Sequence, residues 1–424
     1  MHAAKERVFA AQEALRDRMV SFLQRLVRIP SSRGHEKGCQ ELMASLMREY
    51  DLEVDAFDVD VETLQGKRGF TPVEWTYADR PNVVGVLRGT GGGRSLILNA
   101  HIDTTETGPR ELWERDPCSG DIVGNILHGR GASDDKSGCT EMVFLAAALR
   151  NAGVLLKGDL ILQSVIEEET TGNGTLACMA RGYDADAAVI VDGTNRDTVI
   201  TAHSGGVHVR ISILGRPGPS AGNPSAANAI HEACGIVTAL HDLQDRKNAA
   251  LPRSPSADHA PCPFSMHATG IEGGEGLGNV AARCVVECSA HFSSEDTVRS
   301  VRGEIEACVK NAASRSPWLR EHPPRLTYHA LSHDAVAARQ DSELVRLLQR
   351  CGRETLGVSI RPTAVAGWGD MRHFSLNKPT DCCFYGPGVY GGGMHSPDEY
   401  AELDGMLPVS RVLASLVLEW CGST

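Results

Sequence analysis

The chain has 424 residues, of which 42% are apolar and 23% charged, a composition typical of globular rather than disordered or fibrous proteins. Lysine and arginine number 42 against 54 for aspartate and glutamate, and the net charge of −12 disfavours nucleic acid or an anionic membrane as a partner. No apolar run approaches the ~18 residues that span a bilayer.

The cysteines and the N-terminal segment give evidence on the cellular location of the protein. Thirteen cysteines are scattered along the chain without a CxxC pair, so a disulfide framework is not expected. The first residues, MHAAKERVFAAQEALRDRM, lack the apolar core of a signal peptide. Together these features predict a cytoplasmic protein.

At about 150 residues per domain the length suggests two or three domains, and the first half of the chain predicts alternating strands and helices. Apolar spacing predicts helices within the first fifty residues and another at Ser137–Gly153. The predicted strands are Val54–Val61, Asn82–Leu87, Leu96–Ala100, Asp159–Ile166 and Ala187–Val191. Because the last two are continuous apolar runs, we expect an α/β core with a largely parallel sheet.

The pattern changes near His203. The elements predicted after it are a strand at His208–Leu214, a proline- and glycine-rich loop at Gly215–Pro224, a helix at Ala226–Leu243, a strand at Cys284–Phe292, a helix at Glu295–Ala312 and a strand at Arg325–His329. This order describes an inserted α+β domain over residues 204–331. Residues 1–203 and 332–424 then form the α/β domain, which resumes with a helix at Ser342–Thr355 and a strand at Cys382–Tyr385.

Candidate metal ligands stand where predicted strands end, the place at which α/β folds build their sites. His101 and Asp103 follow the strand at 96–100, and Asp103 could orient a metal-binding imidazole. In GRGASDDKSG, residues 129–138, Asp134 or Asp135 could serve as a ligand or could cap the next helix. Asp192 ends a further strand.

Three adjacent glutamates, Glu167, Glu168 and Glu169, follow the strand at 159–166. Neighbouring carboxylates at the edge of a core repel one another unless cations or protons neutralise them. A hydrolase can use one as a metal ligand and one as a general base, while a solvated acidic loop is the alternative. His395 lies between glycines and acids in YGPGVYGGGMHSPDEY, residues 385–400, and adds a second imidazole.

In order, these segments resemble the co-catalytic metallopeptidases that include acetylornithine deacetylase, succinyl-diaminopimelate desuccinylase, aminoacylase and carboxypeptidase G. The resemblance runs from about residue 20 to the C-terminus. It rests on HxD, GRGxxD, the paired glutamates, a strand-end acid, AGWGDMRHF at 366–374 and a late HxPDE. It implies a zinc-exopeptidase-like catalytic domain, a mostly parallel mixed sheet flanked by helices, and an inserted ferredoxin-like lid that pairs two subunits into a homodimer.

The resemblance also implies a centre of two divalent metal ions. The ligands would be Asp134 as the bridge, His101 and Asp192 on one ion, and Glu169 and His395 on the other. Glu168 would be the general base, and Asp103 would hold His101. This donor set suits zinc first and would also accept manganese or cobalt.

Two positions in the inserted domain depart from the family pattern. Where the family carries an oxyanion-stabilising histidine, the alignment places Pro219, which cannot donate a hydrogen bond, although Asn228 of the following NAI is kept. Where the family carries an arginine that grips a substrate carboxylate, His291 stands instead. Arg372 is the remaining candidate anchor, unless it forms an ion pair with Asp370.

The sequence therefore predicts a metal-dependent hydrolase that cleaves a non-ring C–N bond of a small carboxylate-bearing substrate, foremost the amide of an N-acyl amino acid. The altered lid favours a second hypothesis, an aminohydrolase that displaces an aromatic amino group with water and releases ammonia. A third is a catalytically inactive binding subunit.

Overall fold

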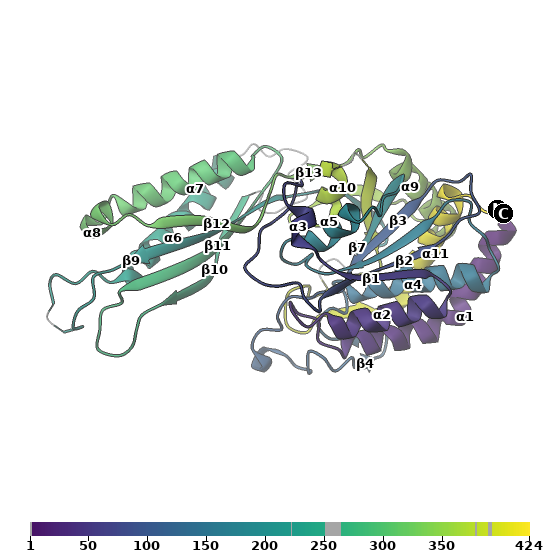
Figure 1. The fold of residues 1–424 in the computed structure, drawn as a ribbon, viewed down its shortest axis with the longest axis horizontal. Helices are drawn as coiled ribbons and strands as arrows, with labels where there is room; N and C mark the ends of the chain where they lie inside the picture. The colour runs from purple at the N-terminus through teal and green to yellow at the C-terminus, as the bar shows by residue number, and fades with distance from the viewer. Residues whose placement is uncertain (1, 222, 251–263, 378–379, 389–391) are drawn as a thin grey trace.

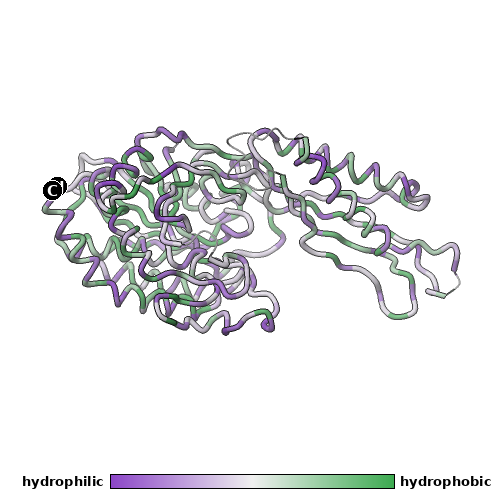
Figure 2. The backbone as a smooth tube through the Cα atoms, turned by 180° about the vertical axis from the view of Figure 1, so that it is seen from behind, coloured by the Kyte–Doolittle hydropathy of each residue, from purple (hydrophilic) through white to green (hydrophobic). Residues whose placement is uncertain are grey.

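The computed structural model describes residues 2–221, 223–250, 264–377, 380–388 and 392–424. Its elements form two parts that lie side by side along the longest axis (Figure 1). Apolar segments, green in Figure 2, run through both parts. Among the helices of these ranges, none combines the length and apolar character needed to cross a bilayer.

The larger part is built on a nine-stranded sheet in the order β1-β2-β6-β3-β7-β15-β8-β13, with β14 paired to β8. The strands are β1 Glu53–Asp58, β2 Pro81–Leu87, β3 Leu96–His101, β6 Leu160–Val165, β7 Ala187–Gly193, β8 Thr198–His203, β13 Val336–Ala337, β14 Arg361–Val365 and β15 Asp381–Gly386. The central pairs β6–β3, β3–β7 and β7–β15 are parallel, whereas the outer pairs β1–β2 and β2–β6 are antiparallel. Every residue of β3 and β6 is buried, which explains their continuous apolar sequences.

Helices cover both faces of this sheet. The larger core packs α1 His2–Val27, α2 Lys37–Glu49, α4 Lys136–Asn151, α9 Glu343–Leu356 and α11 Leu403–Trp420. The opposite face carries α5 Asn173–Ala180 and α10 Met371–Asn377, and the short α3 Val61–Leu64 packs beside α5. The arrangement confirms the predicted fold class, an α/β domain with a mixed, centrally parallel sheet.

The smaller part is a four-stranded antiparallel sheet in the order β10-β11-β9-β12. Its strands are β9 Gly205–Leu214, β10 Phe264–Gly273, β11 Arg283–Phe292 and β12 Arg325–His333, and its helices are α6 Ala229–Ala250, α7 Val298–Ala313 and α8 Pro317–Glu321. Val207, Val209 and Ile211 of β9 alternate with half-buried polar residues and face the helices in a separate core.

A third, small sheet joins two distant segments of the larger part. It pairs β16 Tyr400–Glu402 with β5 Ile126–His128, and β5 also pairs with β4 Ile122–Val123. A short 3₁₀ turn, η1, lies before this sheet at Arg110–Leu112. Because Tyr400 lies opposite His128, the segment after His395 is brought against the GRG turn at residues 129–131.

The predicted elements agree with the structure except at several ends and edges. The strand predicted over 54–61 stops at Asp58, since Asp60 caps the short helix α3. The helix predicted over 226–243 starts at Ala229 and continues to Ala250. Helices α5, α10 and α11 and strands β8, β10 and β14 were not predicted. Strands β10 and β14 have few buried residues and so lack a clear apolar pattern.

Candidate metal centre

The candidate ligands come together at one edge of the nine-stranded sheet. Strands β6, β3 and β7 are parallel neighbours, so the loops after them meet at the same edge. The side chains gathered there are His101 at the end of β3, Asp134 before α4, Glu168 and Glu169 after β6, Asp192 in β7 and His395 in the loop before β16.

Asp134 lies between two imidazoles. Its Oδ1 is 2.9 Å from His101 Nε2, and its Oδ2 is 3.1 Å from His395 Nε2. His395 Nε2 is also 2.9 Å from Glu169 Oε2. Burial alone would raise the pKa of Asp134, but hydrogen bonds to the two histidines hold it below its usual value. One carboxylate oxygen directed at each imidazole is the arrangement that a carboxylate bridging two cations requires.

Two groups of donors here are compact enough for a metal ion. Ligand atoms of His101, Asp134 and Glu169 all lie within 4.8 Å of one another, as do those of His101, Asp135 and Asp192. Burial and the nearby charge of Asp134 raise the pKa of Asp192 to about 7. Burial and the same neighbour raise the pKa of Glu169. So many buried acids favour cations as their neutralising partners.

The sequence left open whether Asp134 and Asp135 bind metal or cap a helix, and the structure gives the two residues different roles. Asp135 Oδ1 accepts a hydrogen bond from Gly138 N at 3.1 Å and caps α4. Its Oδ2 accepts from His101 N at 3.2 Å and so ties the end of β3 to the helix. Asp134 is left to face the histidines.

The three glutamates also separate by their partners. Glu167 is a structural residue, because its carboxylate accepts hydrogen bonds from Tyr77, Thr170 and Thr171 and forms an ion pair with Arg80. This leaves two glutamates directed at the centre.

Asp103 holds the turn that carries these two glutamates. Its Oδ1 accepts from Glu168 N at 3.3 Å and its Oδ2 from Glu169 N at 3.2 Å. Asp103 was predicted to orient the His101 imidazole, and it does so mainly through its main chain. His101 Nδ1 lies 2.9 Å from the Asp103 carbonyl oxygen and 3.6 Å from Asp103 Oδ1. With Nδ1 bonded in this way, Nε2 is available for a metal.

Glu168 is buried beside the centre, with Oε2 at 4.0 Å from His101 Nε2. Its pKa is raised well above the usual value, first by burial and further by the negative charges of Asp370, Glu169 and Asp192, although His101 opposes the shift. A carboxylate with a raised pKa can accept a proton and pass it on near neutral pH.

Glu399 is a site residue to which the sequence analysis gave no role. Its Oε2 accepts from Gly131 N at 3.0 Å and Arg130 Nη1 at 2.7 Å, and its Oε1 from Ser133 N at 3.0 Å and Asp134 N at 3.1 Å. It therefore fixes the turn that carries Asp134. The signal in the sequence was Arg130 of the GRG motif, a buried cation that needs an acid.

The predicted substrate-binding residues do not join this group. Asn228 Oδ1 accepts from Ile230 N at the start of α6, and His291 Nε2 lies 3.0 Å from Ser289 Oγ on β11. Arg372 is fully buried, donates from Nη1 to the Gly369 carbonyl oxygen at 2.8 Å, and lies 3.6 Å from Asp370 Oδ1. The Arg372 geometry matches the ion-pair alternative, and a substrate carboxylate could reach the guanidinium only if its surroundings moved.

Residues 97–419 match the model of Peptidase family M20/M25/M40. The N-formyl-4-amino-5-aminomethyl-2-methylpyrimidine deformylase of Halalkalibacterium halodurans is 28% identical over 386 residues, covering 85% of this chain and 88% of that protein. The succinyl-diaminopimelate desuccinylase of Leptothrix cholodnii is 24% identical over 405 residues, covering 93% and 96%.

A solved structure shares the whole architecture. The dipeptidase Dug1p of Saccharomyces cerevisiae superposes with a TM-score of 0.80 over 99% of both chains, at 15% sequence identity. An identity this low shows a shared fold, and the fold includes both the larger and the smaller part.

Proposed function

The chain belongs to peptidase family M20/M25/M40, and from this premise we propose how its candidate centre works and on what. It is a hydrolase of amide C–N bonds, in keeping with the deformylase and desuccinylase among its relatives. The proposed substrates are small N-acylated amines, with N-acyl amino acids and N-formylated amines as the first classes to test. The observation that carries the proposal is the Asp134 carboxylate between His101 and His395, with Glu168 beside it.

We propose two divalent cations as cofactors, with zinc first and manganese or cobalt as alternatives. The buried acids support this, since the pKa values of Glu169 and Asp192 are raised while no lysine or arginine pairs with either among the described residues. Asp134 would bridge the cations, as the resemblance implies. Once bound, the cations would polarise the acyl oxygen and acidify a water molecule.

In this proposal the protein's own groups move the proton. Glu168 takes a proton from the attacking water and delivers it to the leaving nitrogen. Asp103 sets the position of Glu168 through the backbone N–H groups of the turn. The Glu168 carboxylate thereby acts as base and then as acid.

Two further features belong to the proposal. Residues 204–331 form a lid that pairs two subunits, a role implied by the family resemblance. A reducing, cytoplasmic environment suits the twelve described cysteines, all of which are free.

Glu168→Gln tests the base. We expect the purified variant to keep its metal content, measured by mass spectrometry, and to lose at least about 100-fold in kcat, because general-base catalysis typically contributes 10²–10⁴-fold. Exposed Glu111→Gln is the matched control. Full activity of Glu168→Gln would refute the assignment.

The reaction class is tested by the products that the metal-loaded enzyme releases from N-acyl amino acids, N-formyl amines and aromatic amines. Hydrolysis of an amide yields an amine and a carboxylic acid in equal amounts. Ammonia without any carboxylic acid would instead identify the aminohydrolase. Chelation should abolish either activity, and readdition of zinc or manganese should restore it.

A further inference from the structure

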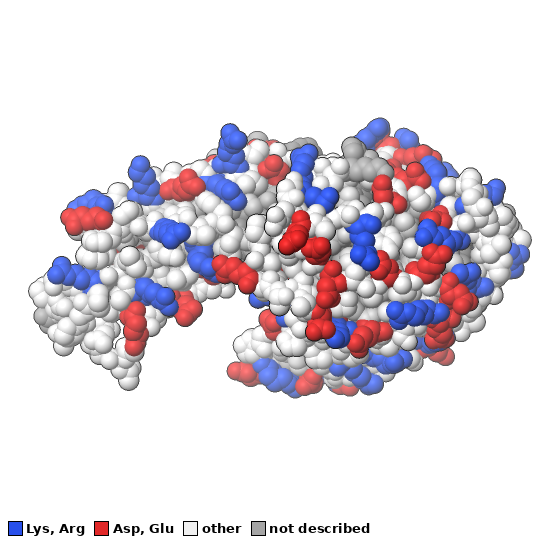
Figure 3. Space-filling model, in the orientation of Figure 1, with Lys and Arg blue, Asp and Glu red and all other residues white. Residues whose placement is uncertain are grey.

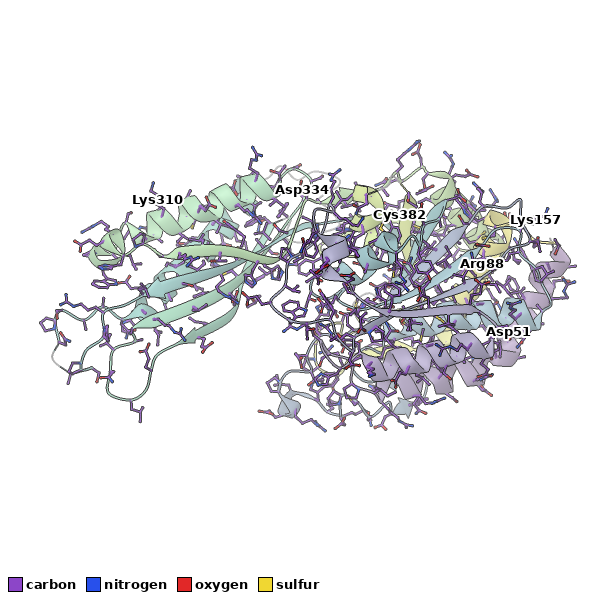
Figure 4. The ribbon with its side chains drawn as sticks, in the orientation of Figure 1. Asp51, Arg88, Lys157, Lys310, Asp334 and Cys382 are labelled. Carbon is purple, nitrogen blue, oxygen red and sulfur yellow. The ribbon has the colours of Figure 1, made fainter. Side chains whose placement is uncertain are left out.

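Aromatic side chains gather where the smaller sheet joins the larger one. Trp368, half-buried in the segment before α10, has its ring centroid 4.7 Å from that of His291, 5.4 Å from His208 and 6.4 Å from His333. The ring of His203 lies 5.6 Å from that of His333. His203 ends β8 and His333 ends β12, so these two residues stand where the chain crosses between the parts. Asp334, labelled in Figure 4, marks this junction.

This aromatic cluster (Trp368, His203, His208, His291 and His333) lies next to the candidate base. Gly369 follows Trp368, and a Cβ at Gly369 would stand 3.5 Å from Glu168 Oε1. On the face shown in Figure 3, a hollow opens between the two parts, and acidic and basic side chains are interspersed around it. The backbone that carries Trp368 therefore continues directly beside the Glu168 carboxylate.

The hydrogen bonds of His203 and His333 determine which ring nitrogen carries the proton. His203 Nδ1 is 2.9 Å from the Ser204 carbonyl oxygen, and His333 Nδ1 is 2.8 Å from that of Asp334. Since a carbonyl oxygen only accepts, each Nδ1 carries the proton. Burial lowers the pKa of His203 to about 4 and that of His333 well below its usual value, and the charge of Arg372 adds to both shifts. Both rings are therefore neutral near pH 7.

In such a tautomer each Nε2 holds a free lone pair and can only accept. The Nε2 atoms of His203 and His333 are buried, and neither has a hydrogen-bond partner among the described residues. A buried acceptor without a partner costs free energy unless a ligand or water supplies a donor. The junction thus calls for N–H or O–H groups and disfavours a carboxylate at these atoms.

Gly206 packs its backbone closely against the indole and near one acceptor. A Cβ at this position would lie 3.2 Å from Trp368 Cε3 and 3.6 Å from His333 Nε2. The φ angle of Gly206 is not positive, so its backbone conformation does not require glycine. Its lack of a side chain matters for space rather than for conformation.

Resting on the amide hydrolysis proposed above, we propose that the aromatic cluster recognises a planar aromatic or heteroaromatic ring bearing an amino group. The ring packs against Trp368, and the amino group donates to Nε2 of His333. Packing between aromatic rings favours a planar ligand over a saturated one of equal size by about two- to twelvefold.

Three formamides of matched size test the proposal with the metal-loaded full chain: N-(4-aminobenzyl)formamide, N-benzylformamide and N-(cyclohexylmethyl)formamide. We expect kcat/KM to fall in that order, with each step at least about twofold. Equal values for all three, or the reverse order, would overturn the inference while leaving amide hydrolysis in place.

Four variants separate the contributions of the indole, the acceptor and Gly206. Trp368→Leu should remove the advantage of benzyl over cyclohexylmethyl, whereas Trp368→Phe should keep most of it. His333→Phe keeps a ring but removes the acceptor, so it should remove only the advantage of the amino group. Gly206→Ala should lower kcat/KM for the aminobenzyl compound more than for the cyclohexylmethyl compound. Variants that slow all three substrates by the same factor would contradict the assignment.

Binding without turnover tests the inference apart from the reaction. Calorimetric titration of metal-loaded Glu168→Gln with N-(4-aminobenzyl)formamide should give a lower Kd than titration with the cyclohexylmethyl compound, and Trp368→Leu in that background should remove the difference. If this holds while no amide is hydrolysed by the wild type, the proposed function is wrong and the aromatic site stands. Equal Kd values would show that the aromatic site is wrong.

Discussion

Glu399 sets the position of Asp134 although the two residues are 265 positions apart in the chain. Its carboxylate is fully buried and accepts hydrogen bonds from three backbone N–H groups and from Arg130. All four donors belong to the turn at residues 130–134. Glu399 therefore positions Asp134 without contacting the two histidines that Asp134 faces.

Replacing Glu399 with Gln should weaken metal binding more than it weakens catalysis. The amide keeps the size but replaces one accepting oxygen with a donating NH₂ group, so two of the four donors lose their acceptor. Because loss of such supporting contacts typically costs 10–100-fold in metal affinity, we expect the metal concentration for half-maximal activity to rise by about that factor. Activity should recover in excess metal. Glu402→Gln, exposed on β16, is the control, and an unchanged metal titration would contradict the role.

Helix α4 is buried from Lys136 to Leu149, which is why its sequence is apolar on every side. It carries a buried acid, Glu141, which forms no ion pair among the described residues. Burial raises the pKa of Glu141 to about 8, and the Ser410 hydroxyl offsets only part of this shift. The carboxyl group is therefore protonated in the folded state at pH values where it is ionised in the unfolded chain.

The stability of the protein should depend on pH through Glu141. Because the folded pKa is above the unfolded value of 4.5, the folded state binds the proton more tightly, and the unfolding free energy falls as pH rises through this window, by at most about 1.4 kcal/mol per pH unit. Glu141→Gln removes the ionisation. Its melting temperature relative to wild type should increase steadily from pH 5 to pH 8, while exposed Glu111→Gln should show no such trend. A constant difference across this range would contradict the prediction.

Most elements with continuous or regularly spaced apolar residues could be predicted from the sequence, and elements defined by tertiary contact could not. Helix α11 is an exception: it is apolar but was missed, and Pro408 interrupts its pattern. Strands β3, β6 and β7 are buried on both faces, so their sequences alone identify them. Strand β10 has an exposed second half, and its pairing with β11 depends on the folded sheet. Its sequence therefore gives no alternation to detect.

The same distinction applies to the site. His101, Asp192 and the glutamates could be predicted because each follows a recognisable strand. Glu399 ends the HxPDE motif, but its role could not be predicted, because its four donors reach it only when β16 pairs with β5. Of the aromatic cluster, only His291 was predicted as a substrate-binding residue; the other members were missed because the cluster draws on three strands of the smaller sheet, on β8 and on the segment before α10.

At the scale of the whole molecule, the smaller part extends away from the larger one and exposes sheet edges (Figure 1). Strands β10 and β12 are the edges of its four-stranded sheet. Ile271 on β10 is 56% exposed and Leu277 in the following loop is fully exposed. An unpaired edge beside exposed apolar side chains is a surface suited to pairing with another chain.

We therefore expect a homodimer formed through the smaller part, measured as twice the chain mass by light scattering at micromolar concentration. Ile271→Lys should weaken the dimer, because a charge at this edge opposes strand pairing and is costly to bury. Leu112→Lys, at an exposed apolar position on the larger part, is the matched control and should leave the mass unchanged. A monomeric wild type would refute the dimer, and a dimer insensitive to Ile271→Lys would place the interface elsewhere.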